Sequence, residues 1–477
     1  MITLEEAAQA TGGQFLTRPA GECPPLRGAA FDTRSLGEAE LFFALTGEHS
    51  DGHTFLPRLA GSHVRLAVVS REAPLGDWNG AVLQVPDTLT AMADMARFVT
   101  AKYQPCVVAI TGSYGKTTSK EVIAHVLAGG RRVLKSEGSL NNEIGIPITL
   151  LGLDGTQEVA VLEFSARKPG DIAYLGAIAP PDIAVLLAVG HAHIGVFGSR
   201  EAIYRTKGEI FQALRPGGLA LAGAQDPRLR DLAEGHRTQT FGIGCGDYSA
   251  EEVRLDGEGR QHFQGVHENT RLGLTAGMPG PHGAEPVLAA WAVARELGLP
   301  DTLVAQRAGF HPVQKGRAQI VTTVQGATIV DDCYNASPET VINLAGILAA
   351  RREPEKILVL GPLAELEEGL ETSLALIASH LKPPLTSCLV FDPEGRGLAG
   401  TLRRGAQIAI HDLHTQSELI RALNALNAPG RVIGLKGARS AHMERFVAAL
   451  QGKTVTCERR PCGLLKYCTE CENLGAP

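Results

Sequence analysis

Short apolar runs, separated by polar turns and predicted helices, form the main pattern along this chain. Residues 107–110, 159–164 and 183–189 are mostly apolar, which is typical of buried strands. Helices are predicted between such runs, at residues 119–128 and 200–214. Because strands that alternate with helices form largely parallel sheets, the sequence predicts an α/β fold.

The chain has 477 residues, more than one hydrophobic core normally supports, and its pattern divides into several predicted domains. Residues 1–103 predict a small α/β domain that ends in a linker around residues 100–105. Residues 104–312 predict a central domain with a parallel sheet, and residues 451–477 form a separate tail. A third domain with a parallel sheet is predicted at residues 313–450, with strands at 327–330, 356–360, 387–391, 407–410 and 431–435.

Residues 215–310 are expected to close the central domain. Their Gly- and Pro-rich segments predict turns. An alanine-rich helix is predicted at residues 286–297.

A glycine-rich loop, Thr-Gly-Ser-Tyr-Gly-Lys-Thr-Thr at residues 111–118, follows the first apolar run. Gly112 and Gly115 allow a tight turn whose N–H groups face an anion at the start of a helix. Lys116 is then expected to neutralise the β- and γ-phosphates of a nucleotide, and Thr117 to hold Mg²⁺. The spacing is shorter than that of the common phosphate-loop motif. A plain Gly-rich turn between strand and helix is therefore the alternative.

Potential metal ligands follow the next two strands. Glu163 lies near the end of one apolar run, and His191 and His193 directly follow another. Ligands of open α/β sheets bind at the carboxyl ends of strands, so Glu163 is predicted to ligate Mg²⁺ rather than form a core salt bridge. A histidine at this edge can ligate a second divalent ion or position a phosphate, and a structural hydrogen bond is the alternative.

Two further polar features lie in the central part of the chain. Asn141 and Asn142, followed by Glu143, form a polar turn that a plain loop would not require. Lys207 lies on the helix predicted at residues 200–214, where a solvated lysine is the ordinary expectation. The neighbouring motifs, and not the residue itself, make it a functional candidate.

A polar triplet, Asp32, Thr33 and Arg34, lies among predicted turns near the N-terminus. It could bind a sugar or a diphosphate, because arginine makes forked contacts with phosphate and threonine offers a hydroxyl. A surface ion pair between Asp32 and Arg34 is the alternative.

A second polar cluster follows the strand predicted at residues 327–330. Asp331, Tyr334 and Asn335 gather in the loop after this strand, which predicts a place for a ribose or a base. The preceding segment carries Arg317.

The composition excludes some classes of function. A net charge of −6 gives no electrostatic signal for nucleic acid. No apolar run approaches the ~20 residues of a membrane span, and the N-terminal residues do not resemble a signal peptide. A cytoplasmic protein without a membrane partner is expected, and scattered cysteines suit a reducing compartment.

Four of the nine cysteines crowd into the tail, as Cys457, Cys462, Cys468 and Cys471. Four thiols suffice for tetrahedral Zn²⁺, and the Cys-x₂-Cys spacing of the last two is usual for ligands. A disordered tail of free thiols is the alternative, and a redox role is a third.

Taken together, the motifs resemble those of the Mur ligases, ATP-dependent amide-forming enzymes of peptidoglycan synthesis. The resemblance runs from residue 31 to about residue 450. It rests on residues 111–118 with Lys120 and Glu121, on residues 140–147, on residues 196–210 and on residues 331–336. Within the family, the members that add D-alanyl-D-alanine to a UDP-MurNAc tripeptide are the most similar, and the tail lies outside the resemblance.

The resemblance implies a UDP-sugar-binding N-terminal domain, a central ATP-binding domain and a C-terminal Rossmann-like domain. The substrate carboxylate would attack the γ-phosphate of ATP, and an amine would displace phosphate from the resulting acyl phosphate. Thr117 and Glu163 would hold one Mg²⁺ and His193 a second, and Lys207, once carbamylated, would be an extra acidic ligand. Lys116, His193 and Lys207 would be the catalytic residues. ATP would contact Gly112, Ser113, Gly115, Lys116, Thr117, Thr118, Asn142, Arg317, Asp331, Tyr334 and Asn335, and the uridine diphosphate Asp32, Thr33 and Arg34.

Three functions are therefore weighed. The first is the D-alanyl-D-alanine ligase, acting as a monomer on a UDP-sugar peptide and a D-dipeptide. The second keeps the chemistry but joins another acid and amine. The third is a non-catalytic nucleotide-binding protein, which would have little need for two metal sites.

Overall fold

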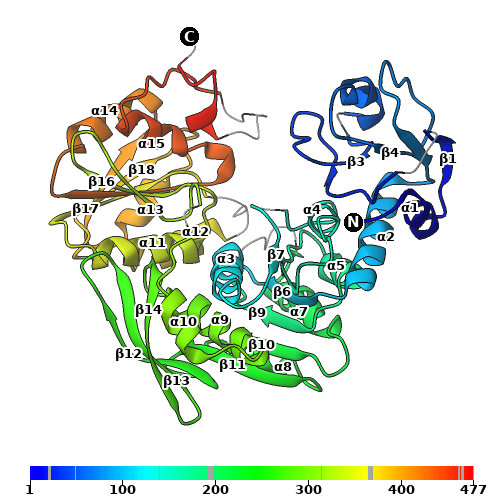
Figure 1. Cartoon of the computed structure of the whole chain (residues 1–477). Helices are drawn as coiled ribbons and strands as arrows, with labels where there is room; N and C mark the ends of the chain where they lie inside the picture. The colour runs from blue at the N-terminus through cyan, green and yellow to red at the C-terminus, as the bar shows by residue number, and fades with distance from the viewer. Residues whose placement is uncertain are drawn as a thin grey trace. The chain divides into compact units, whose positions relative to one another are not determined.

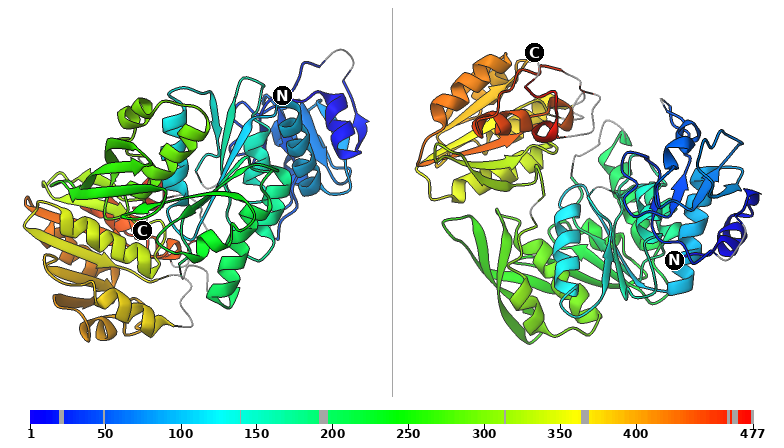
Figure 2. Two further views of the ribbon diagram at one scale, coloured as in Figure 1. Left: turned by 90° about the horizontal axis from the view of Figure 1, so that it is seen from below. Right: turned by 45° about the horizontal axis from the view of Figure 1, so that its top comes forward.

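The computed structural model describes residues 1–475 except 20–22, 49, 139, 191–196, 313, 364–368, 460–461 and 463–466. Contacts group the chain into two compact units. Its helices and strands are drawn in Figures 1 and 2. The first unit comprises Met1–Val189, Glu201–Phe241 and Ala289–Val304. The second comprises Gly190–Arg200, Gly242–Leu288 and Ala305–Pro477. The predicted α/β fold is confirmed, whereas the predicted domain boundaries stay predictions.

The N-terminal part of the first unit is built on a five-stranded sheet in the order β1-β5-β4-β3-β2. Its strands are β1 (Gln14–Thr17), β2 (Ala29–Ala30), β3 (Leu41–Phe43), β4 (Leu66–Val69) and β5 (Ala81–Gln84). β1 is antiparallel to β5 and the other pairs are parallel. The helical elements are α1 (Leu4–Thr11), the 3₁₀-helix η1 (Gly52–Leu59) and α2 (Thr88–Tyr103).

The predicted linker is wrong for residues 100–103, which belong to α2. Met95, Val99 and Thr100 are buried, so the apolar face of the helix continues through its last turns. The helix ends at Gln104, which has a left-handed φ of 47° and whose N–H donates to the carbonyl oxygen of Thr100. The helix thus leads almost directly into the next strand.

The central sheet of the first unit contains six parallel strands in the order β11-β10-β9-β6-β8-β7. They are β6 (Cys106–Thr111), β7 (Val133–Lys135), β8 (Val159–Glu163), β9 (Ile183–Leu186), β10 (Leu219–Gly223) and β11 (Arg237–Ile243). The chain's helices in this region are α3 (Lys116–Leu127), α4 (Gly145–Leu150), α5 (Asp171–Ile178), α7 (Arg200–Gln212), α8 (Arg228–Asp231), α9 (Ala284–Glu296) and α10 (Asp301–Arg307). In the register of this sheet, Ile110 of β6 lies opposite Glu163 of β8. The carboxyl ends of these two strands therefore meet at one edge.

Residues 242–288 contain strands that the sequence analysis missed. β12 (Tyr248–Leu255), β13 (Arg260–His267) and β14 (Thr270–Pro279) form an antiparallel set. The residues of β13 alternate between exposed or half-buried positions and buried ones, and Tyr248 stacks on His267 with ring centroids 3.8 Å apart. This period of two is the signal of a half-buried strand, but the neighbouring Gly and Pro residues predicted only turns.

The second unit also holds a six-stranded sheet in the order β15-β16-β20-β17-β18-β19. Its strands are β15 (Gln319–Thr322), β16 (Thr328–Asp332), β17 (Glu355–Leu360), β18 (Ser387–Phe391), β19 (Ala409–Leu413) and β20 (Arg431–Lys436). All pairs are parallel except β15 with β16. The helical elements are α11 (Pro338–Ala350), α12 (Leu370–Ala378), α13 (Leu398–Arg403), α14 (Gln416–Leu426), η2 (Arg439–Ala441), α15 (Glu444–Leu450) and η3 (Cys468–Glu470). Four of the five strands predicted here are confirmed, and the one predicted at residues 407–410 lies two residues later, as β19.

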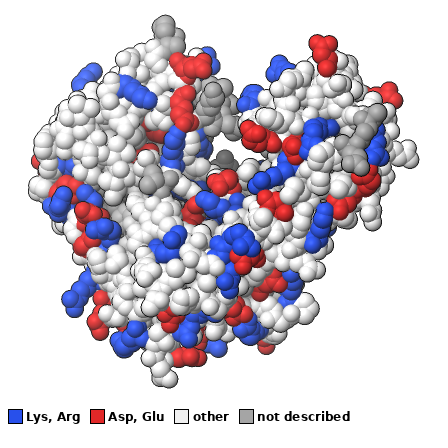
Figure 3. Space-filling model, viewed as in Figure 1, with Lys and Arg blue, Asp and Glu red and all other residues white. Residues whose placement is uncertain are grey.

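Basic and acidic side chains are interspersed over the face shown in Figure 3. Among the described residues, no helix is both long and apolar enough to cross a membrane.

Candidate active site

The loop between β6 and α3 has the shape that a phosphate site requires. Gly115 precedes α3 with a left-handed φ of 78°. A Cβ atom on Gly112 would lie 3.2 Å from the carbonyl oxygen of Ala188, so a larger residue would crowd this turn. The Nζ atom of Lys116 donates to the carbonyl oxygen atoms of Gly112 at 2.8 Å and Ser113 at 3.3 Å. The ammonium group therefore lies over the loop, next to the positive end of the helix dipole.

Glu163 presents an unpaired oxygen at the same edge of the sheet. It is the last residue of β8 and is 1% exposed. Its Oε1 accepts a hydrogen bond of 2.8 Å from Asn141 Nδ2, and its Oε2 is buried with no hydrogen-bond partner among the described residues. A buried carboxylate oxygen without a partner is costly. A hard cation such as Mg²⁺ would satisfy it, and Thr117, in the first turn of α3, offers a buried hydroxyl.

Lys207 is buried, whereas an isolated lysine on a helix would ordinarily be solvated. It lies on α7 and is 2% exposed. Burial, and then the positive charge of Lys116, lower the pKa of Lys207 to about 7, against the opposing charge of Glu163. The charges of Lys116 and Glu163 therefore both act on Lys207. A large part of Lys207 is an uncharged amine near neutral pH.

A buried lysine that the sequence analysis gave no role supports this edge of the sheet. The Nζ atom of Lys120, on α3, donates to the carbonyl oxygen atoms of Ser136 at 2.5 Å and Gly138 at 3.2 Å. It also pairs with Glu121 at 3.0 Å. Ser136 Oγ in turn accepts from the backbone N–H of Glu163 at 3.2 Å. The loop that leads to Asn141 is thus fastened to both α3 and β8.

We expect Lys120→Ala to lower the free energy of unfolding by about 3 kcal/mol, because Glu121 and two carbonyl oxygen atoms would lose a buried partner. Urea unfolding measures this change. Lys135→Ala is the matched control, since Lys135 pairs with the same carboxylate at 2.6 Å but its side chain is 33% exposed. Its expected cost is about 1 kcal/mol or less. Equal losses in the two variants would contradict the anchoring role of Lys120.

The two adjacent asparagines have different roles in the structure. Asn141 holds Glu163, although the sequence analysis assigned only Asn142 to the cofactor. The Oδ1 atom of Asn142 accepts from the N–H groups of Ile144 at 3.3 Å and Gly145 at 2.9 Å, at the start of α4. A nucleotide contact by Asn142 stays a prediction.

The predicted nucleotide loop of the second unit gathers around Tyr334. The guanidinium carbon of Arg317 lies 4.1 Å from the centre of the Tyr334 ring. Burial raises the pKa of Asp331, whose Oδ1 accepts from the N–H of Cys333. Asn335 Oδ1 accepts from the N–H of Ala336. These contacts shape a loop around an aromatic ring, and its binding of a nucleotide stays a prediction.

The same loop contains a buried ion pair that the sequence analysis missed. Lys436, at the end of β20, pairs with Asp332 at 2.5 Å. Asp332 also accepts from the N–H of Ala318 at 3.1 Å. The chain places these residues at the ends of neighbouring parallel strands, which a sequence without structure does not reveal.

In the N-terminal triplet, Asp32 and Arg34 form a surface ion pair, which was the alternative to ligand binding. Arg34 makes a forked contact with Asp32, with Nη2 2.6 Å and Nε 2.9 Å from its two carboxylate oxygen atoms. The side chain of Arg34 is 78% exposed. Binding of a uridine diphosphate by Asp32, Thr33 and Arg34 stays a prediction, and the exposed pair is open to an anionic ligand.

His193, predicted to hold a second Mg²⁺, lies outside the described residues, as does His191. Metal ligation by His193 stays a prediction.

Comparisons with known protein families agree with this geometry. The Mur ligase middle domain matches residues 110–294. The Mur ligase glutamate ligase domain matches residues 316–439. These matches include the phosphate loop, Glu163, Lys207 and the loop around Tyr334.

Several curated relatives carry the same enzyme name. The UDP-N-acetylmuramoyl-tripeptide–D-alanyl-D-alanine ligase of Bacillus subtilis is 32% identical over 94% of this chain and 98% of its own. The enzyme of the same name from Escherichia coli is 30% identical over 88% of this chain and 92% of its own. Nothing in the comparisons favours the alternative of another acid and amine.

Solved structures of MurF enzymes are also similar to this chain over most of its length. A crystal structure of MurF from Acinetobacter baumannii has a TM-score of 0.84, at 28% identity, and covers 95% of this chain and 99% of that one. A MurF ligase from Thermotoga maritima in complex with ADP has a TM-score of 0.78, at 28% identity, over 90% of this chain and 97% of that one.

Proposed function

Because the chain belongs to the Mur ligase family, we propose that it joins D-alanyl-D-alanine to a UDP-MurNAc tripeptide at the expense of ATP. The observation that carries this proposal is the full-length likeness to enzymes of that name. The sheet edge of the first unit supports it, because a phosphate loop, a buried carboxylate with an unpaired oxygen and a lysine of lowered pKa occur there together.

In the first step, a carboxylate oxygen of the tripeptide forms a bond to the γ-phosphorus of ATP, and the bond from that phosphorus to the bridging oxygen breaks. ADP leaves and an acyl phosphate forms. Two anions approach one another in this step, so positive charge must offset their repulsion. Lys116 supplies a charge over the loop, and the N–H groups at the start of α3 supply further donors.

In the second step, the amino group of D-alanyl-D-alanine attacks the acyl carbon. The carbon–nitrogen bond forms, the carbon–oxygen bond to phosphate breaks, and the amine loses its proton. Inorganic phosphate leaves with the oxygen that came from the carboxylate. Water must be excluded while the acyl phosphate exists, because hydrolysis would return the carboxylate without forming the amide.

The residues at this edge fit Mg²⁺. Glu163 offers an unpaired buried oxygen and Thr117 a buried hydroxyl, and both are oxygen ligands of the kind that Mg²⁺ accepts. When bound, the ion neutralises charge on the transferring phosphate. Asn141 fixes the other oxygen of Glu163 and so orients its carboxylate.

We expect Asn141→Ala to raise the Mg²⁺ concentration needed for half-maximal turnover about tenfold, because Glu163 would lose the amide that orients it. Phosphate release at saturating ATP, followed over a range of Mg²⁺ concentrations, measures the change. Maximal turnover should be largely restored at high Mg²⁺. An unchanged Mg²⁺ requirement would show that Asn141 does not orient this carboxylate.

We further propose that Lys207 reacts with CO₂. Its lone pair forms a nitrogen–carbon bond, a proton is released, and the product is a negatively charged carbamate. The low pKa makes the neutral amine available for this reaction near pH 7. A carbamate is an oxygen ligand for a hard cation, whereas an ammonium group is not a ligand at all.

The remaining assignments belong to the same proposal. Asp32, Thr33 and Arg34 would bind the uridine diphosphate, and Arg317, Asp331, Tyr334 and Asn335 the nucleotide. We expect a monomer that works in the cytoplasm, where ATP is found.

Phosphate release tests the proposed function. The full chain, ATP and Mg²⁺ are combined with UDP-MurNAc tripeptide and a panel of amines. Rapid release that requires both the tripeptide and D-alanyl-D-alanine is the expected result. Rapid release with another amine, and none with D-alanyl-D-alanine, would contradict the substrate assignment. Release independent of both substrates would contradict ligase activity.

A further inference from the structure

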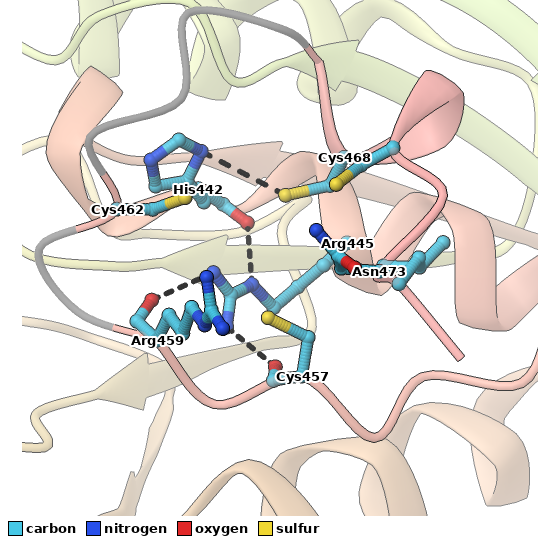
Figure 4. Close-up of a pocket in the computed structure, with 9 residues that line it drawn as sticks. His442, Arg445, Cys457, Arg459, Cys462, Cys468 and Asn473 are labelled. Atoms are coloured by element: carbon cyan, nitrogen blue, oxygen red, sulfur yellow. Dashed lines mark hydrogen bonds between the residues drawn. The ribbon is translucent and has the colours of Figure 1, made fainter. Parts of the chain in front are cut away.

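We infer that the C-terminal tail binds one zinc ion through the thiolates of Cys457, Cys462, Cys468 and Cys471. All four residues line one small pocket of the second unit. Figure 4 shows the sulfur atoms of Cys457, Cys462 and Cys468 turned into this pocket. The tail therefore folds so that cysteines separated along the chain meet in one place.

Backbone hydrogen bonds bring the two cysteine pairs together. The N–H groups of Thr456 and Cys457 donate to the carbonyl oxygen of Leu474, at 3.0 and 3.2 Å. The N–H of Cys471 donates to the carbonyl oxygen of Cys468 at 3.2 Å, which closes a tight turn within the Cys-x₂-Cys sequence. Such a turn is the usual way in which two nearby thiolates reach one zinc ion.

The size of the pocket suits an ion and not an organic ligand. Its volume is about 10 Å³, close to that of a single water-sized sphere. Thiolates are soft ligands and select zinc or other soft metals over Mg²⁺. This site is thus chemically distinct from the oxygen ligands at Glu163 and Thr117.

A buried positive charge beside the pocket favours an anionic centre. Arg445 is fully buried, and its guanidinium donates to the carbonyl oxygen atoms of Cys457 at 2.8 Å, Arg459 at 3.2 Å and His442 at 3.2 Å. It also donates to Gln416 Oε1 at 3.3 Å. These acceptors are all neutral, and no ion pair of Arg445 is found within the described part of the chain. A buried cation without a counter-charge is costly, and four thiolates around Zn²⁺ carry a net charge of −2.

Two further polar residues support the thiols and are not assigned as ligands. His442, Glu444 and Cys468 bring potential ligand atoms within 4.8 Å of one another. Glu444 Oε1 already accepts from Arg439 at 2.5 Å and from the N–H of Cys468 at 3.3 Å. His442 Nδ1 faces this oxygen at 3.2 Å and the sulfur of Cys468 at 3.7 Å. Glu444 therefore holds the backbone of Cys468, and His442 holds the thiolate of Cys468.

The apolar core of the tail is small within the described residues. Its buried apolar cluster consists of Cys468 and Leu474 packed on Ala448, with Val455 partly buried beside them. So small a core rarely stabilises a segment of this length without a metal or a disulfide. Within the described part of the tail, the four sulfur atoms do not all lie within 4.8 Å of one another, so zinc binding requires the tail to tighten around the ion.

The site also bears on the predicted nucleotide loop. The hydroxyl of Tyr467 donates to the carbonyl oxygen of Lys315 at 2.9 Å, and Glu470 pairs with the ammonium group of Lys315. Lys315 lies two residues before Arg317, which stacks on Tyr334. A zinc ion that fixes Cys468 and Cys471 would therefore steady this loop.

Metal content of the purified full chain tests the inference. After exposure to zinc and desalting, the wild-type chain should hold about one zinc ion, measured by atomic emission. The Cys468→Ser, Cys471→Ser double variant should hold less than about a tenth of that amount. Cys245→Ser is the matched control, because Cys245 lies outside the tail, and should retain the wild-type content. A wild-type chain without zinc, or a double variant that retains it, would overturn the inference.

Cobalt replacement identifies the ligands and does not depend on whether the double variant folds. Wild-type chain stripped of zinc should take up Co²⁺ and show the intense sulfur-to-cobalt charge-transfer absorption of a thiolate site. His442→Gln should keep that absorption, and its loss would overturn the four-thiolate assignment. Resistance of the tail thiols to alkylation in the denatured, metal-free chain would reveal disulfides and would also overturn it.

Discussion

Lys116→Ala should lower the turnover of ATP about a thousandfold. The ammonium group of Lys116 lies over the phosphate loop and donates to the carbonyl oxygen atoms of Gly112 and Ser113. In the proposed reaction its charge would offset the negative charge on the transferring phosphate, and removal of one such group typically costs about 10²- to 10³-fold. We expect the loss mainly in kcat, because the charge matters most in the transition state.

Lys382→Ala is the matched control for this variant. Lys382 is an exposed lysine of the second unit that is not among the predicted site residues, and its loss should leave turnover unchanged. Phosphate release with both substrates measures the two variants, and a thermal unfolding scan shows whether each is folded. A folded Lys116→Ala variant with near-normal turnover would contradict the assignment of the phosphate loop.

Lys207→Ala should lower turnover by at least about a hundredfold, and short carboxylic acids should restore part of it. The variant loses the buried amine whose pKa is lowered to about 7. If Lys207 is carbamylated as proposed, this variant also loses the oxygen ligand that the carbamate would offer a cation. Acetate or formate can enter the space left by the side chain and supply a carboxylate in its place.

Lys207→Leu is the control for chemical rescue, because leucine fills much of the space that alanine leaves. It should be as inactive as Lys207→Ala and should not respond to acetate or formate. In the wild-type enzyme, bicarbonate should stimulate more strongly as the pH rises through about 7, since only the neutral amine reacts with CO₂. Absence of both rescue and bicarbonate stimulation would contradict the carbamate.

The loop between β6 and α3 was largely predictable from sequence because its signals are local. Gly112, Gly115 and Lys116 lie within one turn between a strand and a helix, and the structure places all of them as the motif predicts. Glu163 was predictable for a related reason. It is an acidic residue at the end of an otherwise apolar strand, and the carboxyl ends of strands in an open α/β sheet are where ligands bind.

Long-range contacts could not be predicted in the same way. Lys120 reaches Ser136 and Gly138, and Asn141 reaches Glu163, only because the sheet brings their segments together. The burial of Lys207 likewise depends on what packs over α7, and a helix by itself predicts solvent exposure. The antiparallel strands between Tyr248 and Pro279 were missed because glycine and proline in this region predict turns more strongly than strands.

Transfer of a labelled oxygen tests the central claim most directly. The terminal carboxylate of the UDP-MurNAc tripeptide is labelled with ¹⁸O, and the enzyme is supplied with ATP, Mg²⁺ and D-alanyl-D-alanine. If the carboxylate attacks the γ-phosphorus, each phosphate released carries one labelled oxygen, which mass spectrometry detects. Formation of the amide with unlabelled phosphate would show that the carboxylate never bonds to phosphorus, and it would contradict the proposed mechanism.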